Sequence, residues 1–136
     1  MHFVEINNTQ TISGAQLQFN TAFPFLKIEF FREAHIPGKG NSKNKMIVVD
    51  TRLQNIQVKP ASGTIMLENK ITVNQLEAKF ENEFGLYVQV FRKSGRIWLE
   101  TTATDNWTLE QQNEEGRSLD EHLKTDRESS DDHDIY

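Results

Sequence analysis

The sequence predicts an α+β domain, with a largely antiparallel sheet of about six strands, two helices on one face of the sheet and a short terminal helix. Two observations predict this architecture. A stretch with the apolar spacing of a helix runs directly into a stretch with the alternation of a strand, and this combination occurs twice, about sixty residues apart. The 136 residues, 36% of them hydrophobic, also suffice for one packed core, and the chain has no cysteine for disulfide bonds.

The first half of the chain predicts a strand, a helix and a second strand. Residues 3–6 are a short strand that ends at two asparagines. Thr11 is an N-cap residue for a helix that runs to Phe23, and Pro24 ends this helix. Residues 26–32 then alternate between the two faces of a strand, one of which is apolar.

The connection between the halves predicts a loop followed by two further strands. Residues 33–45 are rich in Gly, Asn and Lys and predict a long loop. Residues 46–49 are a compact β-rich run, residues 60–63 are a turn, and residues 64–67 are the next strand. The turn is the predicted seam between the two halves.

The second half predicts a helix from Thr72 or Val73 to Phe84, closed by Gly85 as a left-handed C-cap. Its apolar positions echo those of the first helix: Thr11, Ile12, Ala15, Phe19 and Phe23 recur as Thr72, Val73, Leu76, Phe80 and Phe84. Each half therefore reads β-α-β-β. Two explanations are open, either duplication into half-repeats 1–60 and 61–103 or independent selection of the same apolar spacing.

Residues 86–92 and 96–102 predict a β-hairpin. With Ser94-Gly95 as a two-residue turn, the register places Phe91 opposite Trp98, Val90 opposite Leu99 and Gln89 opposite Glu100. The aliphatic face of this hairpin is predicted to meet the helices; it consists of Val88, Val90, Ile97 and Leu99.

The last part of the chain predicts a short helix and a disordered tail. Thr108 and Gln111 have the spacing of a capping box at a helix start. Residues 114–136 contain nine acidic and three basic residues, a net charge of −6, against −5 for the whole chain. This composition favours disorder, so the predicted folded domain is residues 1–113 and its net charge is close to zero.

One mixed aromatic and basic surface is the main candidate for binding. It lies on the predicted sheet face and hairpin and consists of Phe31, Tyr87, Phe91, Arg92, Arg96 and Trp98. Aromatic and Arg side chains are enriched among residues that dominate binding energies. The alternative is that the terminal helix folds back, through Trp107 and Leu109, and covers these rings.

The loop that contains Lys39, Lys43 and Lys45 is a candidate anion-binding segment. Its glycines and lysines could contact a phosphate or a nucleic acid backbone. It departs from the P-loop pattern, because Lys39 is followed by Gly40 rather than by Ser or Thr. The alternative is a solvated connection with no ligand.

The sequence assembles no catalytic, cofactor or metal site. The four histidines have no metal-ligand spacing, and only His35 beside the glycine-rich loop is placed for acid–base chemistry. The chain has no apolar run near the roughly 20 residues that a membrane helix needs, and its N-terminus lacks the basic start of a signal peptide. These features predict a cytoplasmic protein and favour a non-catalytic one; an enzyme is the third alternative, and it would require His35 to lie in a cleft next to a carboxylate.

The segments 88–95, 98–102 and 107–113 resemble a small uncharacterised bacterial protein family. The resemblance covers the C-terminal half, about residues 72–116, and implies a standalone small protein without a known activity or ligand. The residues themselves predict a non-catalytic protein-binding or adaptor module with a protein partner, which uses the aromatic and basic surface. The rival prediction is binding of single-stranded nucleic acid or a phosphate ligand through loop 37–45 and the hairpin tip.

Overall fold

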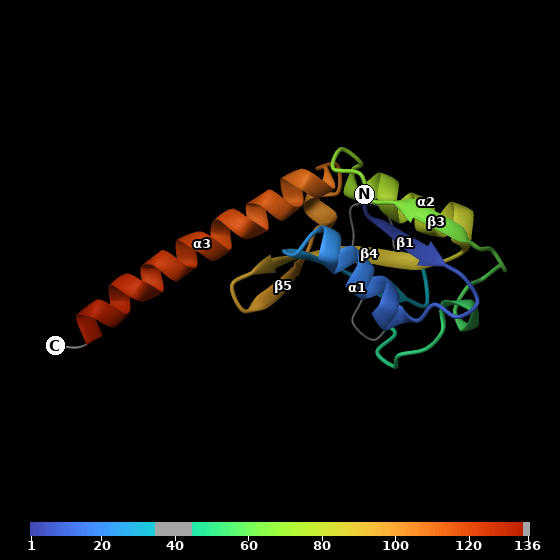
Figure 1. Cartoon of the computed structure of the whole chain (residues 1–136), viewed down its shortest axis with the longest axis horizontal. Coiled ribbons are helices and arrows are strands. Elements are labelled where there is room, and N and C mark those ends of the chain that lie inside the picture. The colour runs from blue at the N-terminus through green and yellow to red at the C-terminus, as the bar shows by residue number, and fades with distance from the viewer. Residues whose placement is uncertain (35–44, 135–136) are drawn as a thin grey trace.

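The computed structural model describes residues 1–34 and 45–134, with side chains placed up to residue 125 (Figure 1). The elements are β1 (Phe3–Ile6), α1 (Ile12–Ala22), β2 (Leu26–Phe31), β3 (Gly63–Met66), α2 (Val73–Phe84), β4 (Tyr87–Ser94), β5 (Ile97–Glu100) and α3 (Leu109–Asp134), with single 3₁₀ turns at Leu53–Asn55 and Thr102–Thr104. The predicted α+β class is confirmed. The predicted single sheet of about six strands is wrong, because the described strands form two antiparallel sheets, β1-β3 and β2-β4-β5.

All three predicted helix starts have the expected caps, and at the third, Thr108 and Gln111 form a reciprocal capping box at the start of α3. The Thr11 side chain accepts the backbone N–H of Gly14, and Thr72 forms a reciprocal capping box with Gln75. Gly85 ends α2 in the left-handed conformation at φ 62°, as the sequence predicts. The apolar face of each helix packs into one core, in which Phe19, Phe30 and Phe80 are fully buried.

Strand pairing relates the two halves of the chain by a local two-fold axis. Glu29 on β2 pairs with Gln89 on β4, which is the residue sixty positions later. Val4 on β1 pairs with Ile65 on β3, which lies 61 positions later. In each sheet a residue therefore pairs with its own counterpart, as happens where a two-fold axis passes between two equivalent strands. In Figure 1, β1 and β3 lie between α1 and α2.

Hydrogen bonds outside the sheets follow the same relation. Ile12 N donates to Thr51 O as Val73 N donates to Trp107 O, and both distances lie between 2.9 and 3.0 Å. The next pair is equally matched, because Leu53 N donates to Gln10 O at 2.8 Å and Leu109 N donates to Ile71 O at 2.9 Å. Both leucines are fully buried. The echo in the sequence thus continues in the structure beyond the predicted half-repeats, to the start of α3.

Each half also reaches the junction between helix and strand in the other half. The Gln57 amide donates to Phe84 O at 2.8 Å, at the end of α2. The corresponding Asn113 carbonyl oxygen accepts the backbone N–H of Phe25 at 2.9 Å, just before β2. These reciprocal contacts satisfy backbone groups where a helix ends and a strand begins.

The prediction of a disordered tail from residue 114 is wrong where α3 packs against the hairpin. A Cβ atom at Gly116 would lie 2.8 Å from the Phe25 Cβ atom, so the glycine allows a close approach. Lys93 Nζ lies 3.4 Å from the Asp120 carboxylate. Composition alone predicted solvation, but these tertiary contacts hold the helix on the domain, and Figure 1 shows α3 extending past β5.

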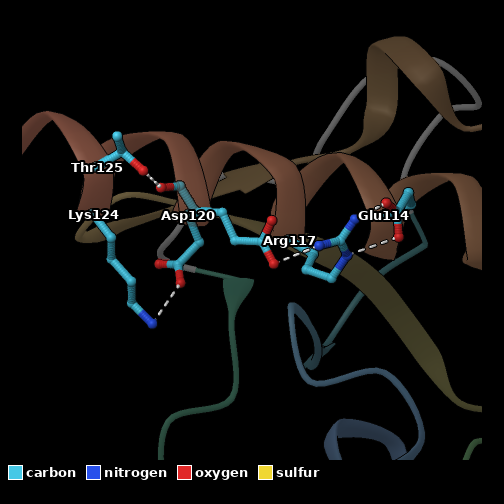
Figure 2. A network of polar contacts seen from close by, with 6 residues as sticks. Glu114, Arg117, Asp120, Lys124 and Thr125 are labelled. Carbon is cyan, nitrogen blue, oxygen red and sulfur yellow. Dashed lines mark hydrogen bonds and ion pairs between the residues drawn. The ribbon is translucent and has the colours of Figure 1, made fainter.

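Charged pairs along α3 also favour the helix (Figure 2). The Arg117 guanidinium lies between Glu114 and Glu121, three residues before it and four after it. Lys124 Nζ lies 3.5 Å from the Asp120 carboxylate, again four residues apart. Such pairs stabilise helices by about 0.2–0.5 kcal/mol each. The acidic composition of this segment is therefore partly neutralised within the helix.

We predict that Gly116→Ala destabilises the protein even though alanine favours a helix. The higher helix propensity of alanine alone would raise the free energy of unfolding by about 1 kcal/mol. Overpacking of its methyl group against Phe25 lowers the free energy of unfolding by about 1–3 kcal/mol. Denaturant unfolding measures the difference, with Ser118→Ala on the exposed side of α3 as the control. An increase in the free energy of unfolding for Gly116→Ala would contradict the close contact between α3 and residue 25.

Candidate interaction surface

The β4-β5 turn differs from its predicted position by one residue. Ser94 pairs with Ile97, so the turn consists of Gly95 and Arg96. Gly95 has a φ of 64°, and Arg96, like every described non-glycine residue, has a negative φ. A positive φ at the first turn residue alone defines a type II′ turn, which favours glycine at that position. The predicted Ser94-Gly95 turn would have required serine in a left-handed conformation. As a result Phe91 pairs with Glu100, and Lys93 pairs with Trp98.

Three of the six predicted surface residues make contacts inside the protein. Phe31 and Phe91 are buried, at 3% and 7% exposed. Arg92 lies on the opposite face of β4 from Phe91, where Nη1 donates to Gln112 Oε1 at 2.8 Å and the guanidinium lies 5.8 Å from the Trp107 ring. These three side chains build the domain and its junction with α3.

The other three predicted residues lie around the hairpin. Tyr87 and Trp98 are half-buried, and Arg96 is exposed. Lys27 Nζ lies 5.0 Å from the centre of the Trp98 ring and 5.5 Å from that of Phe91. The aromatic face is therefore partly covered by a lysine from β2. Trp107 and Leu109 do not cover it as the alternative prediction required, since Trp107 contacts Arg92 on the other face and Leu109 is buried in the core. The terminal helix approaches the Trp98 side only farther along, at Asp120 and Leu123.

The outer edge of β5 is the feature that the sequence prediction missed. β5 is the last strand of its sheet, and within the described residues no strand pairs with its outer edge. The backbone N–H of Thr101 donates inward to Val90 O, so the N–H and C=O groups of Leu99 and Ile97 also point inward. Those of Trp98 and Glu100 consequently point outward.

Apolar side chains follow this edge. Ile97 is 60% exposed and Leu99 is 39% exposed. The sequence predicted both on the aliphatic face that meets the helices, and they do lie on the same face as Val88 and Val90. They extend past the helices, however, because β5 lies farthest from β2 in the strand order. The sequence did contain one indication of this exposure, because Ile97 and Leu99 belong to the last strand, which is short.

The opposite edge of the sheet is occupied. The Gln16 and Asn20 side-chain amides of α1 donate to Ile28 O and Leu26 O on β2, both at 2.9 Å. Farther along, Ile47 N donates to Phe30 O at 2.8 Å. Helix side chains and a short segment thus satisfy the groups that an edge strand otherwise leaves unpaired. The outer edge of β2 is therefore covered, whereas no described strand covers the outer edge of β5.

A cleft of about 570 Å³ lies between the hairpin tip and α3. Its lining consists of Lys93, Gly95, Arg96, Trp98, Asp120 and Leu123. Burial raises the pKa of the Asp120 carboxyl, but the ion pairs with Lys93 and Lys124 outweigh this, and the net pKa is lowered. Because Asp120 neutralises Lys93, the cleft offers Arg96 as its other cation.

The predicted anion-binding loop is only partly described. Lys39 and Lys43, like His35, lie outside the described residues. Lys45 is described, and its Nζ lies 3.1 Å from a Glu33 carboxylate oxygen. Among the side chains described, those of residues 1–34 and 45–125, no group of three His, Cys, Asp or Glu is placed to hold a metal ion. Across residues 1–34 and 45–134, no helix has the length and apolar character to cross a membrane.

Comparison with protein-family models, with curated proteins and with solved structures found no match. The resemblance to a bacterial family, and the cytoplasmic location, therefore stay predictions. The case for a function rests on the residues around β5.

We predict that Asp120→Asn loosens the outer part of α3 at neutral pH. The lowered pKa means that the Asp120 ion pairs stabilise the fold above the unfolded-state pKa of about 3.9 and are lost as the pH falls through the folded-state value. The protection factors of the amides of residues 117–125, which are exchange rates divided into the intrinsic rates at the same pH, should therefore fall on acidification of the unsubstituted protein. In Asp120→Asn they should be low already at pH 7, and the Asp120 contribution to their pH dependence should disappear.

The matched control for this measurement is Glu115→Gln, which removes an exposed carboxylate from the same helix. It should leave the exchange rates of residues 117–125 close to those of the unsubstituted protein. Equal acceleration in both variants would contradict a specific tether between Asp120 and the hairpin.

Proposed function

We propose that this protein is a non-catalytic protein-binding module whose binding surface is the outer edge of β5. The observation that carries this proposal is a strand edge that no strand of the described residues pairs with, and beside which Ile97 and Leu99 are exposed. An extended segment of a partner can add to such an edge through backbone hydrogen bonds, while side-chain contacts supply specificity. An unpaired edge flanked by apolar side chains is a surface that proteins otherwise cover or block.

The proposed binding surface overlaps the aromatic and basic surface that the sequence predicted. Arg96 and Trp98 belong to both the predicted aromatic and basic surface and the edge of β5. Phe31, Phe91 and Arg92 are excluded as direct contacts because their side chains are held inside the protein. The binding surface is therefore the hairpin itself, with the rest of the sheet as its support.

The rival function, binding of single-stranded nucleic acid or a phosphate ligand, has weaker support. Lys93 is paired with Asp120, and Lys45 is paired with Glu33. Arg92 is hydrogen-bonded to Gln112 and lies over Trp107. Backbone phosphates are bound by cations that are free to replace counterions. At the hairpin tip, these contacts leave Arg96 as the exposed basic side chain.

Photo-crosslinking in the cells that produce the protein tests the proposed surface. Benzoylphenylalanine in place of Ile97 should give discrete protein adducts. The same group in place of Leu17, which is 66% exposed on α1, should give few. Glu100→Pro should abolish the adducts from position 97, because proline removes an outward N–H while an edge strand tolerates it.

Circular dichroism of the Glu100→Pro variant establishes that it is folded. Equal adducts from positions 17 and 97, or adducts that Glu100→Pro leaves unchanged in a folded protein, would contradict binding at this edge. Salt-sensitive binding of single-stranded oligonucleotides would instead support the rival function.

A further inference from the structure

The sequence of the five residues at the β5 edge is complementary to a second copy of itself in antiparallel orientation. They are Arg96, Ile97, Trp98, Leu99 and Glu100. The outer two carry opposite charges, the next two are aliphatic, and the middle one is aromatic. An antiparallel pair of two such strands centred on residue 98 therefore places Arg96 opposite Glu100, Ile97 opposite Leu99 and Trp98 opposite Trp98. Each of these is a favourable class of cross-strand pair.

The backbone of β5 permits this register. The outward N–H and C=O groups are those of Trp98 and Glu100, as the inward bond from Thr101 N to Val90 O requires. Two copies centred on residue 98 would face each other with these outward groups. A register that placed an outward-pointing residue opposite an inward-pointing one, such as Trp98 opposite Leu99, would lose these hydrogen bonds. Backbone direction therefore permits the pair centred on residue 98, and side-chain complementarity favours it among the permitted registers.

Exposure of the side chains agrees with this pairing. Arg96 and Glu100 are exposed and Trp98 is half-buried on one face of the hairpin. Ile97 and Leu99, at 60% and 39% exposed, lie on the other face. A second β5 strand would cover apolar surface on the face of Ile97 and would form two ion pairs on the face of Arg96.

We infer that the partner at the β5 edge is a second copy of this chain, bound by antiparallel pairing of the two β5 strands about a two-fold axis at Trp98. This inference rests on the proposed function and names its partner. The result is a continuous sheet in the order β2-β4-β5-β5-β4-β2. Its ends are the β2 edges that Gln16 and Asn20 already occupy, so the assembly stops at two copies.

Charge reversal at the two ends of the strand tests the inference on the full chain. Sedimentation equilibrium should show a dimer for the unsubstituted protein. R96E and E100R should each weaken dimerisation about tenfold or more, because like charges then meet at both ends of the pair. The double variant R96E/E100R should recover the dimer, and an equimolar mixture of the two single variants should form a heterodimer.

The matched control is K79E on α2, which changes the net charge as much as R96E but lies at an exposed position away from β5. It should leave the dimerisation constant unchanged. Unsubstituted protein that stays monomeric at the highest concentration used would overturn the inference. So would a dimer that the single variants do not weaken, or one that K79E weakens equally.

The mass of the crosslinked product separates this inference from the proposed function. Adducts from position 97 with twice the mass of the chain support self-pairing. Adducts with other proteins, together with a monomeric chain, overturn self-pairing and leave the protein-binding function supported. Lack of any adduct from position 97 contradicts both.

Discussion

Reciprocal strand pairing between the two halves is the constraint on which the rest of the structure depends. β1 pairs with β3 and β2 pairs with β4, so each strand of the first half is completed by one of the second. The residues at the centre of each pairing are counterparts in the sequence, Val4 with Ile65 and Glu29 with Gln89. The buried residues of both halves belong to one core, so we expect that neither half buries its own helix fully without the other.

This arrangement decides which surfaces are left for binding. The outer edge of β2 is filled by side chains of α1 and by Ile47, whereas β5 is an addition at the opposite edge. α3 supports that addition from β4, through the Arg92 contact with Gln112 and the ion pair of Lys93 with Asp120. The symmetric part of the chain thus forms the scaffold, and the extensions of the second half form the candidate surface.

Local signals in the sequence predicted local structure well. Thr11, Thr72 and Gly85 located the helix ends because capping chemistry depends on neighbouring residues. The division into two sheets was not predictable, since alternation does not reveal which strands pair. Burial of Phe91 and the inward contacts of Arg92 depend on packing between distant segments. The start of α3 was predicted from Thr108 and Gln111, but its continuation past residue 113 was hidden by the acidic composition, and the docking contacts of Gly116 appear only in three dimensions.

Separating the two halves tests this reciprocal pairing most directly. Residues 1–61 and 62–136 would be produced as two chains, divided in the connection before β3. Circular dichroism and sedimentation should show that neither is a folded monomer, and that mixing restores native secondary structure in a one-to-one complex. A cooperative, folded monomer formed by either half alone would contradict the dependence of each half on the other.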